Sequence, residues 1–229
     1  ATIPCAQGQT VVIDFTTAMD PNAKPIDGYY IMYSESSSGK GWVHYNGSQG
    51  RKYRVATDVD LSTGVTTEQA QYIWMLLNDS ENGTFTLWNL GGNVYMPADA
   101  SRNANMGATT PANLAIEAVE GEGNEGKWFV SQTNYTNSGN TLYIHTNTPG
   151  GYPNLSYWDS KSVNGSSIRA MFTQVNLPET TYTINYMCGE EKIASTEVNY
   201  PTGLAVPEML LQGDVPAGYL VQGNGTLSG

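Results

Sequence analysis

One stretch late in the chain has the residue types that could bind a sugar. It brings together Tyr152, Tyr157 and Trp158 with Asn154 and Asp159. An aromatic ring can stack on the apolar face of a sugar ring, and a few amide or carboxylate groups can fix the hydroxyls. We therefore predict that these five residues bind a ligand. The competing interpretation is that Tyr157 and Trp158 only cover one end of the domain.

Catalytic signatures are absent from the sequence. It contains no HExxH, GxSxG, Walker or EF-hand pattern. The two histidines, His44 and His145, occupy equivalent positions in two repeated segments, so we expect them at the surface and too far apart to share a metal ion. Pairs of carboxylates that could hydrolyse glycosides lack a distinguishing context. The sequence predicts a protein that is not an enzyme and that needs no metal or other cofactor.

Three segments of the chain repeat one pattern, in which a glycine is followed two positions later by an aromatic residue. They are residues 28–34, 83–89 and 126–132. In each of them the aromatic residue lies on the same face as an apolar residue two positions later, as is typical of a half-buried strand. The pattern therefore predicts three equivalent strands.

The aromatic residues of these strands are Tyr30, Phe85 and Trp128, and they share a face with Met32, Leu87 and Val130. We predict that this face of each strand points into one common core.

Three further short runs follow each of these strands, separated by turns rich in glycine and asparagine. The second runs are residues 42–45, 95–98 and 143–146, the third are 54–56, 105–107 and 154–156, and the fourth are 72–74, 115–117 and 167–169. The chain thus has three units of about fifty residues with four strands each.

Twelve strands in three such units resemble the β-trefoil fold, over residues 26–177. A β-sandwich with evenly spaced strands is the alternative. Ricin-type trefoil lectins place an aromatic residue and polar residues in the part of a repeat where Trp158 and Asp159 stand here. The Q-x-W signature that ends their repeats does not occur in this chain. The resemblance implies an all-β carbohydrate-binding domain whose partner is a glycan.

The ends of the chain lie outside the trefoil-like part. Residues 1–25 contain one short predicted strand, and residues 178–229 contain a predicted hairpin with strands at 182–187 and 192–200. This last segment is similar to the small β modules that act as spacers in large bacterial surface proteins, and we expect it to continue beyond Gly229. Cys5 and Cys188 either form a disulfide, which would place the N-terminal strand beside the hairpin, or remain thiols.

The composition limits the partners. The net charge is −11, which disfavours nucleic acid and anionic membranes, and no apolar run is long enough to span a bilayer. We expect a carbohydrate-binding module of a larger secreted or cell-surface bacterial protein, joined to other domains of the same polypeptide. The alternatives are a structural spacer, a protein-binding trefoil of the Kunitz inhibitor or cytokine type, and a non-catalytic part of a glycoside hydrolase.

Overall fold

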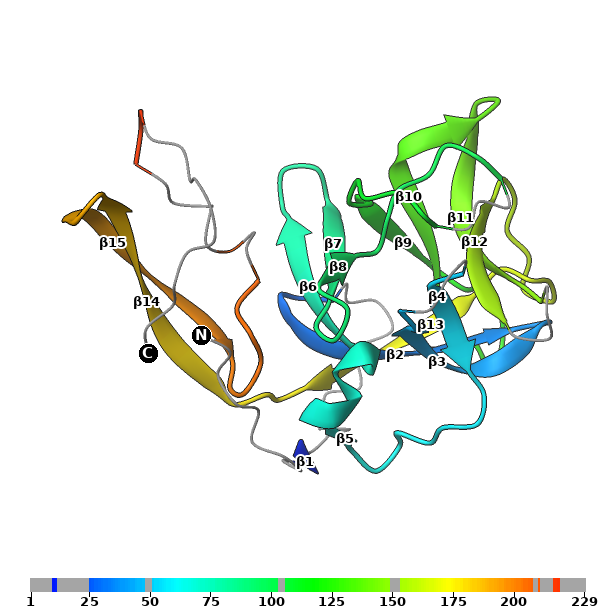
Figure 1. Ribbon diagram of the computed structural model, residues 1–229. Coiled ribbons are helices and arrows are strands. Elements are labelled where there is room, and N and C mark those ends of the chain that lie inside the picture. Colours follow the sequence, from blue (N-terminus) through cyan, green and yellow to red (C-terminus); the bar gives the residue numbers. More distant parts are fainter. Residues whose placement is uncertain are drawn as a thin grey trace. The chain divides into compact units, whose positions relative to one another are not determined.

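β-Strands make up almost all the regular structure of this computed structural model, which describes residues 10–11, 25–47, 51–102, 106–148, 153–207, 210 and 216–218 (Figure 1). A single 3₁₀ helix, η2 (Thr67–Tyr72), interrupts the strands of this described part. The strands are β1 (Thr10–Val11), β2 (Gly28–Ser36), β3 (Gly39–Tyr45), β4 (Tyr53–Ala56), β5 (Val65–Thr66), β6 (Ile73–Asp79), β7 (Thr84–Asn89), β8 (Val94–Tyr95), β9 (Leu114–Ala118), β10 (Trp128–Asn137), β11 (Asn140–Asn147), β12 (Asn154–Trp158), β13 (Arg169–Val175), β14 (Glu179–Cys188) and β15 (Glu191–Pro201).

Six of these strands close a barrel. Around the ring the antiparallel pairs are β2–β6, β6–β7, β7–β9, β9–β10, β10–β13 and β13–β2. The remaining strands of this sheet extend from the barrel as hairpins, and β4 of one hairpin pairs with β12 of another. A closed ring of six strands with attached hairpins is the β-trefoil arrangement, so the predicted all-β trefoil fold is confirmed.

The barrel pairings show the threefold pattern at the level of single residues. Tyr30 is opposite Trp74, Phe85 is opposite Leu114, and Trp128 is opposite Ala170. The sequence alignment of the fourth runs had instead matched Trp74 with Glu117 and Arg169. That alignment was wrong by three residues in the second unit and by one in the third, because the loops before these strands differ in length.

The predicted core is confirmed. Tyr30, Phe85 and Trp128 are buried in one hydrophobic cluster. The residues two positions later in the same strands belong to the same cluster, as do the equivalent apolar residues of the second and third runs: Met32, Leu87, Val130, Val43, Met96, Ile144, Val55, Met106 and Leu155. Alternation along the strands thus places one face of each unit in the barrel interior.

The second unit departs from the predicted four strands. A strand was expected at residues 105–107, but Met106 has a φ of 48° and the described chain from 106 to 113 forms only an isolated bridge between Pro97 and Pro111. Proline cannot donate a backbone hydrogen bond to a neighbouring strand, so a regular ladder is not available here. This part of the unit is a loop, and it borders the pocket described below.

The chain divides into two compact parts, and the described residues from Leu177 onward belong to the part that is separate from the trefoil. This C-terminal part contains the hairpin β14–β15, which confirms the hairpin predicted near residues 182–200. Its turn passes through Gly189, whose φ is 62°. Tyr182, Ile184 and Tyr186 alternate with exposed residues and are buried on one face of β14.

The expected position of the N-terminal strand was wrong for the residues that the structure describes. Thr10 and Val11 pair with Thr66 and Val65 of β5 and not with the hairpin. The expectation had rested on a bond between Cys5 and Cys188. Cys188 is exposed at the end of β14, whereas Cys5 lies outside the described residues. Among the described residues, no helix has the length and apolar character that would let it span a membrane.

Candidate binding site

The predicted ligand residues fall on and beside β12. Tyr152 lies outside the described residues. Asn154 and Tyr157 are buried, with 1% and 0% of their surface exposed. Only Trp158 and Asp159, at the end of the strand, are partly exposed. The structure therefore separates the predicted set into two buried and two accessible side chains.

Tyr157 belongs to the core of the trefoil. Its hydroxyl donates a hydrogen bond to the backbone oxygen of Pro97 at 2.8 Å, and burial raises the pKa of this phenol. The ring thus ties β12 to the segment that follows β8. A side chain in this position cannot stack on a ligand unless the core opens, which argues against the ligand role predicted for it. The same burial argues against Asn154.

Trp158 and Asp159 share a partner that the sequence did not suggest. The guanidinium carbon of Arg102 lies 4.8 Å from the centre of the Trp158 ring. The same group pairs with Asp159, with Nη1 to Oδ2 at 3.3 Å. Arg102 thus already occupies the aromatic face and the carboxylate that a sugar would need.

The two histidines differ from each other. His44 is partly exposed on β3, near the surface position expected for it. His145 is buried, so the expectation of a surface or rim position was wrong for it. Its ring nitrogens contact Ser166 Oγ at 3.0 Å and the backbone oxygen of Ser160 at 2.6 Å, which holds the segment after β12 against β11. Burial lowers the pKa of His145.

Because of His44, the stability of the fold should depend on pH. The His44 ring stacks on Tyr72, with centroids 4.9 Å apart. Burial, and then the charge of Arg54, lower the pKa of His44 to about 4, and Asp58 opposes them only in part. Below pH 6.5 the unfolded chain therefore takes up the proton first, and stability falls until the folded pKa is reached.

We expect His44 to account for a loss of about 2 kcal/mol in the free energy of unfolding between pH 6.5 and pH 4. The full shift would correspond to about 3 kcal/mol at ~1.4 kcal/mol per unit, reduced here because solvent screens a partly exposed ring. His44→Phe keeps a ring against Tyr72 but binds no proton, so its stability should fall less over this range. Urea titrations at several pH values measure this difference. Parallel curves for the two proteins would contradict it.

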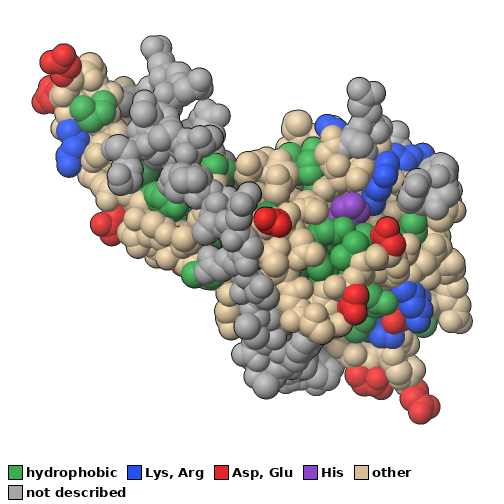
Figure 2. All heavy atoms as spheres, turned by 60° about the horizontal axis from the view of Figure 1, so that its bottom comes forward, with side chains coloured by type: hydrophobic (Ala, Val, Ile, Leu, Met, Phe, Trp, Pro, Cys, Tyr) green, Lys and Arg blue, Asp and Glu red, His purple; other side chains and the backbone are tan. Residues whose placement is uncertain are grey.

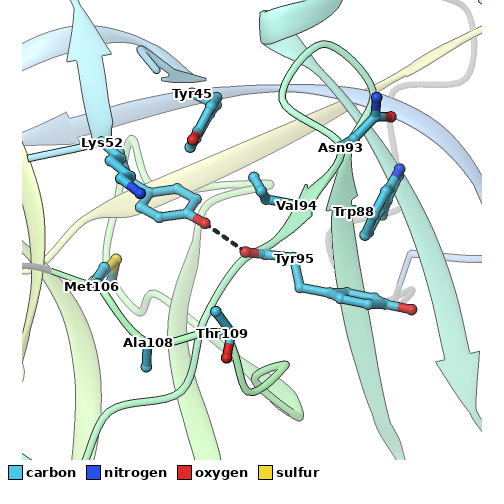
Figure 3. Close-up of a pocket in the computed structure, with 11 residues that line it drawn as sticks. Tyr45, Lys52, Trp88, Asn93, Val94, Tyr95, Met106, Ala108 and Thr109 are labelled. Carbon is cyan, nitrogen blue, oxygen red and sulfur yellow. Dashed lines mark hydrogen bonds between the residues drawn. The ribbon is translucent and has the colours of Figure 1, made fainter. Parts of the chain in front are cut away.

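A pocket of about 230 Å³ lies elsewhere, between the first and second units of the trefoil (Figure 3). Its walls come from the hairpin β3–β4 on one side and from β7, β8 and the following loop on the other. The lining residues are Tyr45, Lys52, Tyr53, Trp88, Asn93, Val94, Tyr95, Met106, Gly107, Ala108 and Thr109.

Aromatic rings form much of the pocket wall. Tyr45 and Tyr53 meet edge to face at 5.4 Å, and Trp88 and Tyr95 do so at 4.8 Å. The Tyr53 hydroxyl donates a hydrogen bond of 2.6 Å to the backbone oxygen of Tyr95, which joins the two walls (Figure 3). Tyr45 and Tyr95 remain partly exposed, while Tyr53 and Trp88 are buried behind them. The pocket therefore offers accessible aromatic surface on a fixed frame.

The backbone around the pocket adopts unusual conformations. Asn93 and Met106 both have φ near 50°, a region that a side chain as bulky as that of Met106 rarely occupies. Backbone strain of this kind gathers at functional sites. Gly92 packs directly on Tyr45, because a Cβ there would lie 2.3 Å from the ring. These contacts fix the position of the Tyr45 ring at the pocket wall.

The polar groups at the edge of the pocket can form hydrogen bonds with a ligand. Lys52, Asn93 and Thr109 are exposed at its edge and supply an ammonium, an amide and a hydroxyl. No histidine, cysteine or carboxylate belongs to the lining residues, and no group of metal-ligating side chains occurs among the described residues. The lining thus supplies hydrogen-bond donors and acceptors.

Comparisons with known proteins leave the function open. No protein-family model matches the sequence, and no curated protein matches it significantly. Among solved structures, a lectin of Polyporus squamosus bound to the human-type influenza-binding epitope Neu5Aca2-6Galb1-4GlcNAc is 15% identical, with a TM-score of 0.46. The match covers 70% of this chain and 52% of the lectin chain, so this chain spans about half the length of that protein. A likeness this distant adds no argument to the site geometry.

Proposed function

We propose that this chain is a carbohydrate-binding domain and that the sugar occupies the pocket between the first two trefoil units. The observation that carries the proposal is the combination of the partly exposed Tyr45 and Tyr95 with the polar groups of Lys52, Asn93 and Thr109. Aromatic surface for the apolar face of a sugar, with a few polar groups for its hydroxyls, is the chemistry of such sites.

The size of the pocket supports a small ligand. Its volume of about 230 Å³ is below the ~300–1,000 Å³ typical of sites for drug-sized molecules, so it suits a single sugar unit of a longer chain. A protein-binding trefoil of the inhibitor or cytokine type would need an extended contact surface, and a spacer would need no pocket. Binding without catalysis, in a secreted or cell-surface protein with further domains, remains part of this proposal.

Filling the pocket tests the proposal. Ala108 is small, exposed and part of the lining, so Ala108→Trp should occupy the space without disturbing the core. Thr136→Trp, at an exposed position of β10, is the matched control. We expect a glycan array to identify a ligand of the unmodified chain, and calorimetry to show at least a tenfold loss of affinity in Ala108→Trp and none in the control.

Trp158→Ala is included to test the alternative location beside β12. We expect this variant to bind as the unmodified chain does, because Arg102 already covers the Trp158 ring. Loss of binding in Trp158→Ala together with normal binding in Ala108→Trp would move the site to β12. Failure of the unmodified chain to bind any glycan would refute the function itself.

A further inference from the structure

The basic residues of the trefoil unit are unevenly distributed over an acidic protein. Figure 2 shows acidic side chains spread over one face, with basic side chains in only a few places. Five basic residues form ion pairs with a carboxylate: Lys40, Lys127 and Arg169 share Glu35, Arg102 pairs with Asp159, and Lys161 pairs with Glu117. These five therefore act within the fold.

The other three described basic residues of this unit lie within four positions, at Arg51, Lys52 and Arg54. Arg51 donates a hydrogen bond of 2.5 Å to the amide oxygen of Asn147, a neutral partner. Arg54 Nε donates to the backbone oxygen of Arg51 at 3.1 Å. Arg51 thus bonds a neutral oxygen atom, and the segment that enters β4 has three basic residues within four positions.

Lys52 brings this charge to the pocket. It is the one charged residue among those that line the pocket, and it forms no ion pair within the part of the chain that the structure describes. Neither Asp nor Glu belongs to the lining.

The effect of Arg54 on the pKa of His44 is a further sign of positive charge near this segment. These residues are opposite each other on β3 and β4, and the charge of Arg54 lowers the pKa of His44 more than Asp58 raises it. The field next to this segment is therefore positive. A negatively charged group would be attracted to it, most strongly where water is partly excluded.

We propose that the ligand of the pocket is an acidic carbohydrate, which places a carboxylate or a sulfate group on the Lys52 ammonium. The inference rests on the proposed function and narrows its ligand class. The aromatic walls would hold the sugar ring, and Lys52 at the edge would favour a ligand that carries a negative charge. A charged hydrogen bond of this kind is stronger than a neutral one, so the acidic form should bind about tenfold more tightly than its neutral counterpart.

Matched pairs of ligands separate charge from sugar recognition. The probes are an oligouronide and the same oligosaccharide after carboxyl reduction, and a sulfated galactan oligosaccharide before and after desulfation. Each pair has one backbone and differs in charge, and the two acidic members distinguish a carboxylate from a sulfate. We expect at least one acidic probe to bind at least tenfold more tightly than its neutral partner, with a preference that shrinks as NaCl rises from 50 to 500 mM.

Variants of Lys52 assign the preference to this side chain. Lys52→Met keeps an unbranched stem without the charge and should abolish the preference for the acidic member of each pair. Lys52→Arg should retain the preference. Lys192→Met, at an exposed position of β15, makes the same change in net charge and should have no effect.

The outcomes separate this inference from the proposed function. Equal binding of acidic and neutral probes, both lost in Ala108→Trp, would overturn the acidic ligand class and leave carbohydrate binding intact. A preference that survives in Lys52→Met would also overturn the role of Lys52. If none of the four probes bound and the glycan array were also empty, the proposed function itself would fall.

Discussion

Tyr157→Ala should lower the free energy of unfolding of the trefoil unit by about 3–5 kcal/mol, the usual cost of removing a large buried ring. The ring is fully buried in the barrel core, and its hydroxyl bonds the backbone oxygen of Pro97. All five tryptophans of the chain lie between residues 42 and 158, so their fluorescence during urea denaturation follows this unit alone.

Two further variants give this measurement its controls. Tyr157→Phe keeps the ring but removes the donor to Pro97, so we expect a loss of about 1–2 kcal/mol. Trp158→Ala removes a neighbouring aromatic side chain that is partly exposed and should cost about 1 kcal/mol. A Tyr157→Ala protein as stable as the unmodified chain would show that this ring does not support the core.

The sequence predicted the parts of the fold that depend on local alternation. Tyr30, Phe85 and Trp128 were placed in one core because each shares a strand face with an apolar residue two positions later, and the structure confirms this. The same argument fails for β12. Its residues are buried at four consecutive positions from Asn154 to Tyr157, so alternation does not tell which face is accessible.

The pocket could not be predicted from the sequence either, but the reason is different. Tyr45 and Tyr95 are far apart in the sequence, and they border one space only because the barrel closes and brings two units together. Arg102 likewise reaches Asp159 across 57 positions of the chain. The nearest sequence signal was the basic segment from Arg51 to Arg54, whose proximity to aromatic rings is visible only in three dimensions.

The role of a glycine can also depend on contacts between residues far apart in the sequence. Replacing one such glycine gives the second prediction with a large expected loss of stability. Gly41 directly precedes the run at residues 42–45, so the sequence places it in one of the predicted glycine-rich hairpin turns. In the structure it lies within β3, opposite Ser34, and a Cβ there would lie 1.9 Å from the backbone oxygen of Ala56. Gly41 is required because two backbones approach closely, which is one of the recognised uses of glycine inside a strand.

Gly41→Ala should therefore lower the free energy of unfolding by about 3 kcal/mol, the upper end of the usual range for overpacking, since the obstacle is a backbone atom that cannot rotate away. Gly107→Ala is the matched control, because a Cβ at Gly107 meets nothing within 4 Å. Its stability should stay the same or rise by up to ~1 kcal/mol, since alanine restricts the unfolded chain. Both values come from the tryptophan fluorescence titration used for Tyr157. Equal stability of the two variants would show that β3 and β4 can separate at Gly41 without cost, and the contact with Ala56 would then not be a constraint on this hairpin.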